Sequence, residues 1–200
     1  MEKIIETLLI ADNEIKNVSF HNARMNKARA DIFGSNTVLD LDEAINIEEL
    51  NPTIKHRCRV TYNETGIIEI IFTPYEEKKI EILKLIDVGN YEYDHKWLNR
   101  DFLLKVLERN PEADDIIMIK NGFVTDSTIA NLAFWDGQNW YVPNTPLLKG
   151  TKREKLLLDK TITETTIKVA DIKKFEKVAL INVFRDLNIQ NAIDCATIIY

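Results

Sequence analysis

The first part of the chain alternates between runs typical of strands and runs typical of helices. Residues 3–10 are rich in β-branched isoleucine and end in a polar stretch, which predicts a strand followed by a turn. A helix is predicted over 20–33, where Gly34 would end it, and a weaker helix over 41–50. Alternating apolar positions then predict strands at 57–62, 67–72 and 79–88. This half is expected to form a sheet with one or two helices on it.

The second part begins after residues 88–97, which have little periodicity and are expected to link the two halves. Helices are predicted over 98–108 and from Thr151, where Thr151-Lys152-Arg153-Glu154 has the form of a capping box. The turn signal Asn121-Gly122 predicts a hairpin. Strands are predicted at 115–119, 132–135, 140–142, 162–169 and 179–183. Helices and hairpins mixed in this way favour an α+β fold over a doubly wound parallel sheet.

Composition excludes several classes of protein. The chain has 200 residues, 45% of them hydrophobic and 29% charged, as expected of a globular protein. A net charge of −6 without a basic run disfavours nucleic-acid binding, and no apolar stretch approaches the roughly 18 residues of a membrane span. The N-terminal stretch lacks the pattern of a signal peptide, so a cytoplasmic protein is expected. Cys58 and Cys195 are too few for a disulfide framework.

Two polar segments in the middle of the chain could carry chemistry. Lys96 lies in Asp94-His95-Lys96-Trp97, where burial beside aromatic groups would let its ammonium lose a proton and act as a nucleophile. The alternative is a solvated linker lysine. Asp126 and Asn131 bracket small hydroxyl residues after the predicted hairpin and could bind a polar cofactor. The alternative is that these residues mark a loop.

Two further segments could bind phosphate. Gly150 precedes a predicted helix start, whose backbone N–H groups can bind an anion, although most capping boxes only cap helices. His21 and Arg24 share one helical face, where a guanidinium could hold a phosphate, although a surface arginine is the commoner case. The histidines have no ligand spacing with Cys58, so no metal is expected.

Taken in order, these segments resemble the class IV aminotransferases, the fold-type IV pyridoxal-phosphate enzymes. That family includes D-amino-acid and branched-chain aminotransferases and aminodeoxychorismate lyase. The segments similar to family motifs are 6–8, 20–25, 96–100, 122–134, 146–153 and 179–187. They correspond in turn to the N-terminal strand, the "H-x-x-R-L" helix, the Schiff-base lysine, the "G-x-x-x-E-x-x-x-x-N-x-F" signature, the "L-x-G-[IT]-x-R" phosphate loop and the C-terminal strand. Their order, with the 30-residue interval from Lys96 to Asp126, carries the resemblance.

The resemblance implies a short version of the two-lobed fold-type IV fold. The expected lobes are residues 1–90 and 97–200, joined by a linker at 91–96 that carries the lysine. Pyridoxal 5′-phosphate would lie in the cleft between the lobes, and the protein would be a homodimer with each site near the subunit interface.

The resemblance also implies roles for individual residues. Lys96 would hold pyridoxal phosphate as an internal aldimine and afterwards transfer protons. Asp126 stands where the family has a glutamate that pairs with the pyridinium nitrogen, so either the loop moves inward or the pairing passes through water. Arg24, Thr151 and Lys152 would bind the cofactor phosphate, and Asn131 would hold the signature loop in shape. Candidate substrate residues are Arg100, Asn182 and Arg185.

The activity expected first is that of an aminodeoxychorismate lyase, which eliminates pyruvate from 4-amino-4-deoxychorismate to give 4-aminobenzoate for folate synthesis. The form of the segments 96–100 and 181–185 favours this lyase branch. The alternative is an aminotransferase acting on D-amino or branched-chain amino acids with 2-oxoglutarate. A third interpretation is a degenerate homologue that acts as a binding protein. In the first two cases the partner is a small-molecule amino substrate.

Overall fold

The computed structural model describes residues 3–200, so the first two residues of the expected N-terminal lobe lie outside it. The chain forms two compact units. Unit 1 contains the chain up to Glu77 together with His95–Asn99, and unit 2 contains Lys78–Asp94 and Arg100–Tyr200. Within the described residues, no helix has both the length and the apolar character needed to cross a membrane.

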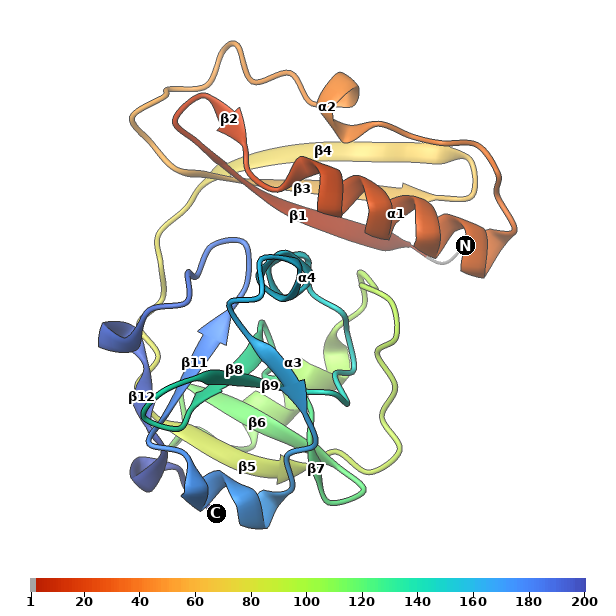
Figure 1. Cartoon of the computed structure of the whole chain (residues 1–200). Coiled ribbons are helices and arrows are strands. Elements are labelled where there is room, and N and C mark those ends of the chain that lie inside the picture. Colours follow the sequence, from red (N-terminus) through yellow and green to blue (C-terminus); the bar gives the residue numbers. More distant parts are fainter. Residues whose placement is uncertain (1–2) are drawn as a thin grey trace. The chain divides into compact units, whose positions relative to one another are not determined.

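Unit 1 is an antiparallel sheet with a helix on one face (Figure 1). The strand order is β2-β1-β3-β4, and helix α1 contacts β1. The elements are β1 (Ile4–Ala11), β2 (Glu14–Ile15), α1 (Val18–Phe33), α2 (Leu41–Ala44), β3 (His56–Asn63) and β4 (Gly66–Pro74). Gly34 adopts a φ of 65° and ends α1, as the sequence predicts.

The weaker helix predicted over 41–50 is wrong beyond its first turn. Asp40 caps α2 by accepting a hydrogen bond from the backbone N–H of Asp42, but Ile45 is already extended. Ile45 is buried in the core of unit 1, and Ile47 packs against that core. The Asn46 side chain accepts a hydrogen bond from the N–H of Glu48, which favours a turn over helix. Burial of β-branched side chains from extended backbone therefore replaces the second half of the expected helix.

Apolar side chains from both layers form the core of unit 1. Alternate positions of β1 and β3 point toward α1, and their side chains are fully or almost fully buried. The buried set contains Ile4, Leu8, Ile10, Met25, Ala28, Leu41, Ile45, Cys58, Val60 and Tyr62. Because β1 is central in the sheet and covered by α1, any polar side chain on this face of β1 must find its partners within the protein.

The segment His95–Asn99 belongs to unit 1 because it pairs with β1. The backbone N–H of Ile5 donates to the carbonyl of Lys96 over 2.9 Å, and Ile4 pairs antiparallel with Trp97. Trp97 packs against the core of unit 1. These contacts fix the backbone of Lys96 beside the first residues of β1, although the two segments are far apart in the sequence.

Unit 2 contains two sheets. One has the order β5-β6-β7, and the other has the order β10-β9-β8-β11-β12. Its strands and α-helices are β5 (Leu83–Asp87), α3 (Asp101–Glu108), β6 (Asp115–Lys120), β7 (Phe123–Val124), β8 (Asn131–Trp135), β9 (Trp140–Pro143), α4 (Thr151–Leu158), β10 (Thr163–Thr165), β11 (Lys177–Ile181) and β12 (Ile193–Asp194). Short 3₁₀ helices cover Val169–Lys174, Ile189–Asn191 and Cys195–Thr197.

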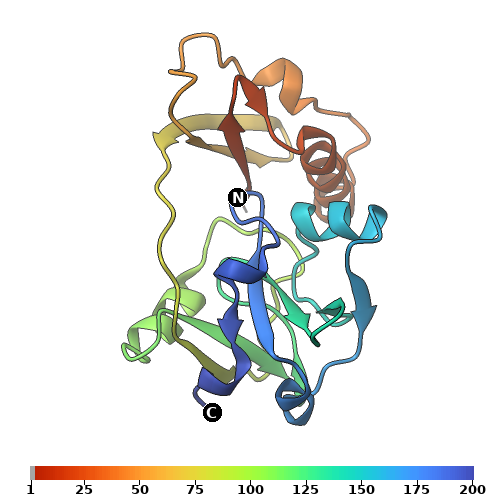
Figure 2. The ribbon, with the colours of Figure 1, turned by 60° about the vertical axis from the view of Figure 1, so that its left-hand side comes forward.

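The sequence predicts that the strand at 79–88 belongs to the sheet of the first half. This prediction is wrong, because β5 lies in unit 2. It pairs in parallel with β6, and Ile199 near the C-terminus pairs with Lys84 on the other side of β5 (Figure 2). Leu83 and Ile117 are buried together in the main core of unit 2. Unit 2 therefore begins at Lys78 rather than after residue 90, and residues 95–99 return to unit 1.

Two turns in unit 2 test the local predictions. Asn121 and Gly122 have φ values of 53° and 79°, and the hairpin predicted there joins β6 to β7. Helix α4 begins at Thr151 as predicted, but Gly150 is its N-cap, so the predicted capping box is wrong.

Most strand pairs are antiparallel, and β5–β6 and β9–β10 are parallel, which is a mixed α+β arrangement.

Candidate functional site

A buried ionic cluster joins β1 to α1 in unit 1. The Glu6 carboxylate accepts a hydrogen bond from Nε of Arg24 at Oε1 over 2.9 Å and one from Nη2 at Oε2 over 2.5 Å. His21 Nδ1 lies 2.6 Å from the same Oε2. Glu6 and His21 are buried, and Arg24 is mostly buried. The guanidinium therefore binds the carboxylate through two parallel hydrogen bonds, the strongest geometry for this pair.

The protonation states of the cluster follow from its charges. Burial alone would raise the pKa of Glu6, but the charge of Arg24 and the hydrogen bonds from His21 and Arg24 outweigh it and lower the pKa to about 2. Burial lowers the pKa of His21 and, together with the positive charges of Arg24 and Lys96, outweighs the contact with Glu6, which acts to raise it. At neutral pH Glu6 is therefore ionised and His21 is neutral, so Nδ1 carries the ring proton and donates a hydrogen bond to the Glu6 carboxylate.

Lys96 and Arg24, both predicted as site residues, come together in unit 1. The backbone of Lys96 is fixed on β1 next to Glu6. The positive charge of the Lys96 side chain lowers the pKa of His21. Glu6 was missed as a functional residue from the sequence. Its signal was available, because it is the one acidic residue among the apolar side chains of Ile4-Ile5-Glu6-Thr7-Leu8.

A second buried carboxylate, Asp126, lies in unit 2 between β7 and β8. Asn131 Nδ2 donates to Asp126 Oδ1 over 2.6 Å, and the backbone N–H of Leu148 donates to Oδ2 over 2.9 Å. Burial raises the pKa of Asp126 to about 6, although these hydrogen bonds and the charge of Arg153 act in the opposite direction. Asp126 therefore keeps its charge less firmly than Glu6 does.

Asn131 connects the signature segment to the start of α4. Its Nδ2 also donates to the carbonyl of Leu148 over 2.8 Å, and its Oδ1 accepts from the N–H of Gly150 over 3.1 Å. The prediction that Asn131 holds the signature loop in shape is confirmed by these contacts.

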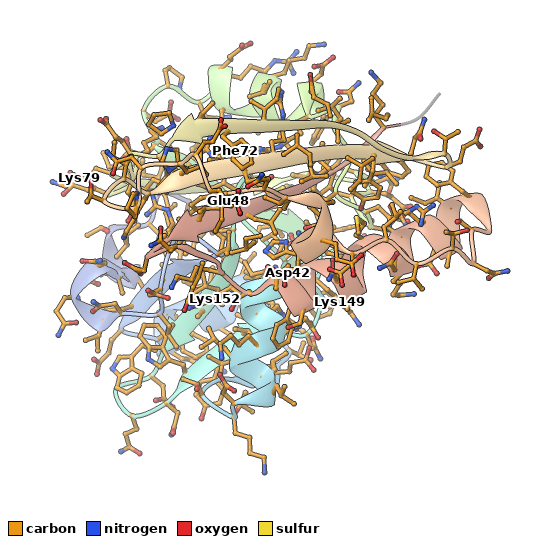
Figure 3. All side chains as sticks on the ribbon, turned by 90° about the horizontal axis from the view of Figure 1, so that it is seen from above. Asp42, Glu48, Phe72, Lys79, Lys149 and Lys152 are labelled. Atoms are coloured by element: carbon orange, nitrogen blue, oxygen red, sulfur yellow. The ribbon has the colours of Figure 1, made fainter. Side chains whose placement is uncertain are left out.

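The start of α4 has the features of an anion site. Its cap residue is Gly150, and no side chain in the described chain caps the helix. The first N–H groups of a helix have no acceptor within the helix, and the helix dipole adds positive potential there. Thr151 is buried in this first turn. Figure 3 shows Lys149 and Lys152 beside the start of α4, so cationic side chains accompany the backbone donors.

The basic residues after Gly150 have different surroundings. The Lys152 ammonium pairs with the carboxylate of Asp186, which is largely exposed. Arg153 is almost completely buried and donates to the carbonyl of Pro143 over 3.1 Å and to the carboxylate of Glu164. Lys152 is thus paired with an exposed acid next to the start of α4, whereas Arg153 ties α4 to β9 and β10.

The three candidate substrate residues are all engaged with backbone groups. Arg100 donates to the carbonyl of Thr128, and Asn182 Nδ2 donates to the carbonyl of Ile129 over 3.1 Å. Asn182 Oδ1 also accepts from the N–H groups of Phe184 and Arg185. The Arg185 guanidinium donates to the carbonyl of Lys78. Arg100 and Asn182 therefore support the same signature segment that carries Asp126.

Each unit, taken by itself, carries groups of the kinds that bind pyridoxal phosphate. Unit 1 provides an amine at Lys96 and a guanidinium at Arg24. Unit 2 provides a buried carboxylate for a protonated ring nitrogen and a helix start with Gly150, which suits close approach of a phosphate. These are the groups that the chemistry of this cofactor requires of a protein.

Comparison with known proteins identifies the family. Residues 3–188 match the model of amino-transferase class IV. An uncharacterised protein of Haemophilus influenzae is 34% identical over 190 residues, which are 94% of this chain and 100% of that protein. A candidate aminodeoxychorismate lyase of Schizosaccharomyces pombe is 34% identical over 101 residues, which are 46% of this chain and 44% of that protein.

A solved structure agrees with the same assignment. The crystal structure of a candidate 4-amino-4-deoxychorismate lyase from Haemophilus somnus superposes with a TM-score of 0.88 at 31% identity. The match covers 94% of this chain and 98% of that one, which confirms the predicted fold class. The chain belongs to the class IV aminotransferases, a family of pyridoxal-phosphate-dependent enzymes.

Proposed function

We propose that this enzyme is a lyase that converts 4-amino-4-deoxychorismate to 4-aminobenzoate and pyruvate. The observation that carries the proposal is the match to the Haemophilus somnus candidate lyase, which extends over 94% of this chain at 31% identity. The candidate lyase of Schizosaccharomyces pombe supports the same choice over 101 residues. The products account for every atom of the substrate, so the reaction needs no second substrate.

In this proposal Lys96 of unit 1 is the residue that carries the cofactor. When bound, pyridoxal phosphate supplies an electron sink for the bonds at the substrate's amino-bearing carbon. Lys96 holds the cofactor through its amine and later moves a proton at that carbon. The hydrogen bond from Ile5 to the Lys96 carbonyl supports this role, because it gives the side chain a fixed starting point on β1.

The remaining site residues bind and orient the same cofactor. Asp126 would pair with the ring nitrogen and keep it protonated, although it is one methylene shorter than the family's glutamate. The first-turn N–H groups of α4 and the Lys152 ammonium would bind the phosphate, and we propose Arg24 as a further phosphate ligand. The Glu6 carboxylate would support Arg24 in this role, because two hydrogen bonds orient the guanidinium.

The lyase proposal is tested by supplying 4-amino-4-deoxychorismate and following 4-aminobenzoate. In parallel, D-amino and branched-chain amino acids are supplied and conversion of the cofactor to its pyridoxamine form is followed. Lys96→Ala should abolish 4-aminobenzoate formation, whereas Lys27→Ala, an exposed lysine on α1, should leave it unchanged. Pyridoxamine formation with turnover on 2-oxoglutarate, and no 4-aminobenzoate, would establish the aminotransferase alternative instead.

The family assignment also leads us to propose that the enzyme is a homodimer. Light scattering in the presence of cofactor should then give about twice the chain mass of 23.2 kDa. A mass of 23.2 kDa at micromolar concentration would contradict the dimer.

A further inference from the structure

We propose that Asn131 is a positioning residue that holds the partner of the cofactor ring and the binding site of the cofactor phosphate in one fixed arrangement. This inference rests on the proposed roles of Asp126 and of the start of α4. It assigns to one neutral amide a function that the signature segment and the phosphate loop would otherwise carry separately.

Both ends of the Asn131 amide are used, each by a group of the correct kind. Nδ2 donates to the Asp126 carboxylate over 2.6 Å and to the Leu148 carbonyl over 2.8 Å. Oδ1 accepts from the N–H of Gly150 over 3.1 Å. An amide nitrogen can only donate and an amide oxygen can only accept, so the reverse orientation of the side chain would lose all three bonds. Asn131 is buried, which prevents water from substituting for these contacts.

A further bond closes the arrangement into a ring. The backbone N–H of Leu148 donates to Oδ2 of Asp126 over 2.9 Å, so Leu148 bonds to both Asp126 and Asn131. Asp126 and Asn131 also pair through their backbones. The signature segment and the loop before α4 are consequently joined at several points around one side chain, and movement of either alters the other.

Gly150 is matched to this side chain. Its φ of −76° and ψ of 144° are ordinary for any residue, so backbone conformation does not require glycine here. A Cβ atom at Gly150 would lie 2.1 Å from Oδ1 of Asn131. The glycine is therefore needed because the Asn131 amide approaches the backbone closely, which makes the two positions energetically coupled.

The test measures binding of two probes by absorbance titration, pyridoxal 5′-phosphate and phosphate-free pyridoxal. Lys152→Ala should weaken binding of pyridoxal phosphate only, since Lys152 acts on the phosphate. Asn131→Ala should weaken binding of both probes, each by about tenfold or more, because it releases Asp126 and the start of α4 together. If Asn131→Ala binds either probe as tightly as wild-type protein does, the inference is overturned.

A double-mutant cycle distinguishes a specific coupling of Asn131 and Gly150 from a general loss of structure. Gly150→Ala alone should weaken binding of pyridoxal phosphate strongly, but should have little further effect in the Asn131→Ala background, where the clashing oxygen is gone. Additive losses would overturn the inference. If Asn131→Ala does not fold, Asn131→Asp replaces it for the probe titrations, since it keeps the size of the side chain but sets a carboxyl group against Asp126. Asn131→Asp should move the pH dependence of the bound cofactor's absorbance, whereas Lys152→Ala should not, and an unmoved profile would likewise overturn the inference.

Wild-type protein separates the two levels of the argument. If wild-type protein binds neither probe through Lys96, the proposed function fails before any variant is compared. If wild-type binds both probes normally and the Asn131 variants do so too, only the inference about Asn131 fails.

Discussion

Glu6 in unit 1 and Asp126 in unit 2 are both buried carboxyl groups, yet their pKa values move in opposite directions. The pKa of Glu6 falls from 4.5 to about 2, whereas that of Asp126 rises from 3.8 to about 6. Desolvation acts on both in the same sense. Glu6 contacts a full positive charge on Arg24, while the direct partners of Asp126 are a neutral amide and a backbone N–H.

The difference shows what each partner type achieves. A guanidinium in contact compensates for the lost hydration of a carboxylate and keeps it ionised at every physiological pH. Neutral donors compensate only in part, so Asp126 remains responsive to a nearby cation. A carboxylate of this second kind suits a role opposite a ring nitrogen that must stay protonated, whereas Glu6 suits a fixed scaffold for Arg24.

The largest expected effect comes from removing the charge of Glu6. Glu6→Gln leaves the Arg24 guanidinium without its buried counter-ion, so the free energy of unfolding should fall by about 3–5 kcal/mol. Chemical denaturation of the cofactor-free protein measures this change. Glu69→Gln, an exposed acid on β4 that lies 3.9 Å from Arg59, is the matched control and should change stability by no more than about 0.5 kcal/mol. Equal effects of the two variants would show that the cluster is not a strong ionic contact.

The two carboxyl groups should also give opposite pH dependences of stability. Glu6 stabilises the fold above pH 4.5, and this stabilisation of about 3 kcal/mol is lost as the pH falls toward 2. Asp126 favours the fold while protonated, so its contribution falls by about 3 kcal/mol as the pH rises from 3.8 through 6. The measurement is the stability difference between wild type and Glu6→Gln, and between wild type and Asp126→Asn, across pH 3 to 8. Slopes of the same sign would contradict the comparison.

Removing the charge of Asp126 should affect catalysis more than folding. Asp126→Asn cannot balance a protonated ring nitrogen, so kcat should fall by about a hundredfold, as for loss of one preorganised electrostatic partner. Steady-state assay with saturating cofactor measures this loss. Asp136→Asn, in the exposed turn between β8 and β9, should leave kcat unchanged. Wild-type kcat in Asp126→Asn would exclude Asp126 from the ring-nitrogen role.

The smallest effect on stability is expected at Lys152. Its ion pair is with the largely exposed Asp186, although the Lys152 side chain itself is only 15% exposed, so Lys152→Ala should change the free energy of unfolding by no more than about 1 kcal/mol. Thermal or chemical denaturation checks this. A loss as large as that of Glu6→Gln would mean that the cation is part of a structural network and not a ligand-binding residue.

Local signals in the sequence predicted local features well. The helix α1 with Gly34 at its end, and the hairpin at Asn121-Gly122, follow from spacing and backbone preference alone. The partner of β5 could not be predicted in this way, because strand pairing depends on contacts between distant segments. The same holds for the pairing of Lys96 with β1.

The candidate site was predictable as a set of residue types, but not as a set of contacts. Lys96, Arg24 and Asp126 are predicted through their motifs. The link from Asn131 to Gly150 spans 19 residues and depends on the close approach of a side chain to backbone, which no local pattern encodes. In the sequence Glu6 is only a polar position in a strand. Its role follows from the fold, in which α1 brings His21 and Arg24 into contact with its carboxylate.

The most direct test of the account is the identity of the lysine that carries the cofactor. Protein reconstituted with pyridoxal 5′-phosphate is reduced with borohydride, digested, and mapped by mass spectrometry. We predict a pyridoxyl group on the peptide that contains Lys96, and its loss in Lys96→Ala. An adduct on a different lysine, or no adduct in protein that has taken up cofactor, would contradict it.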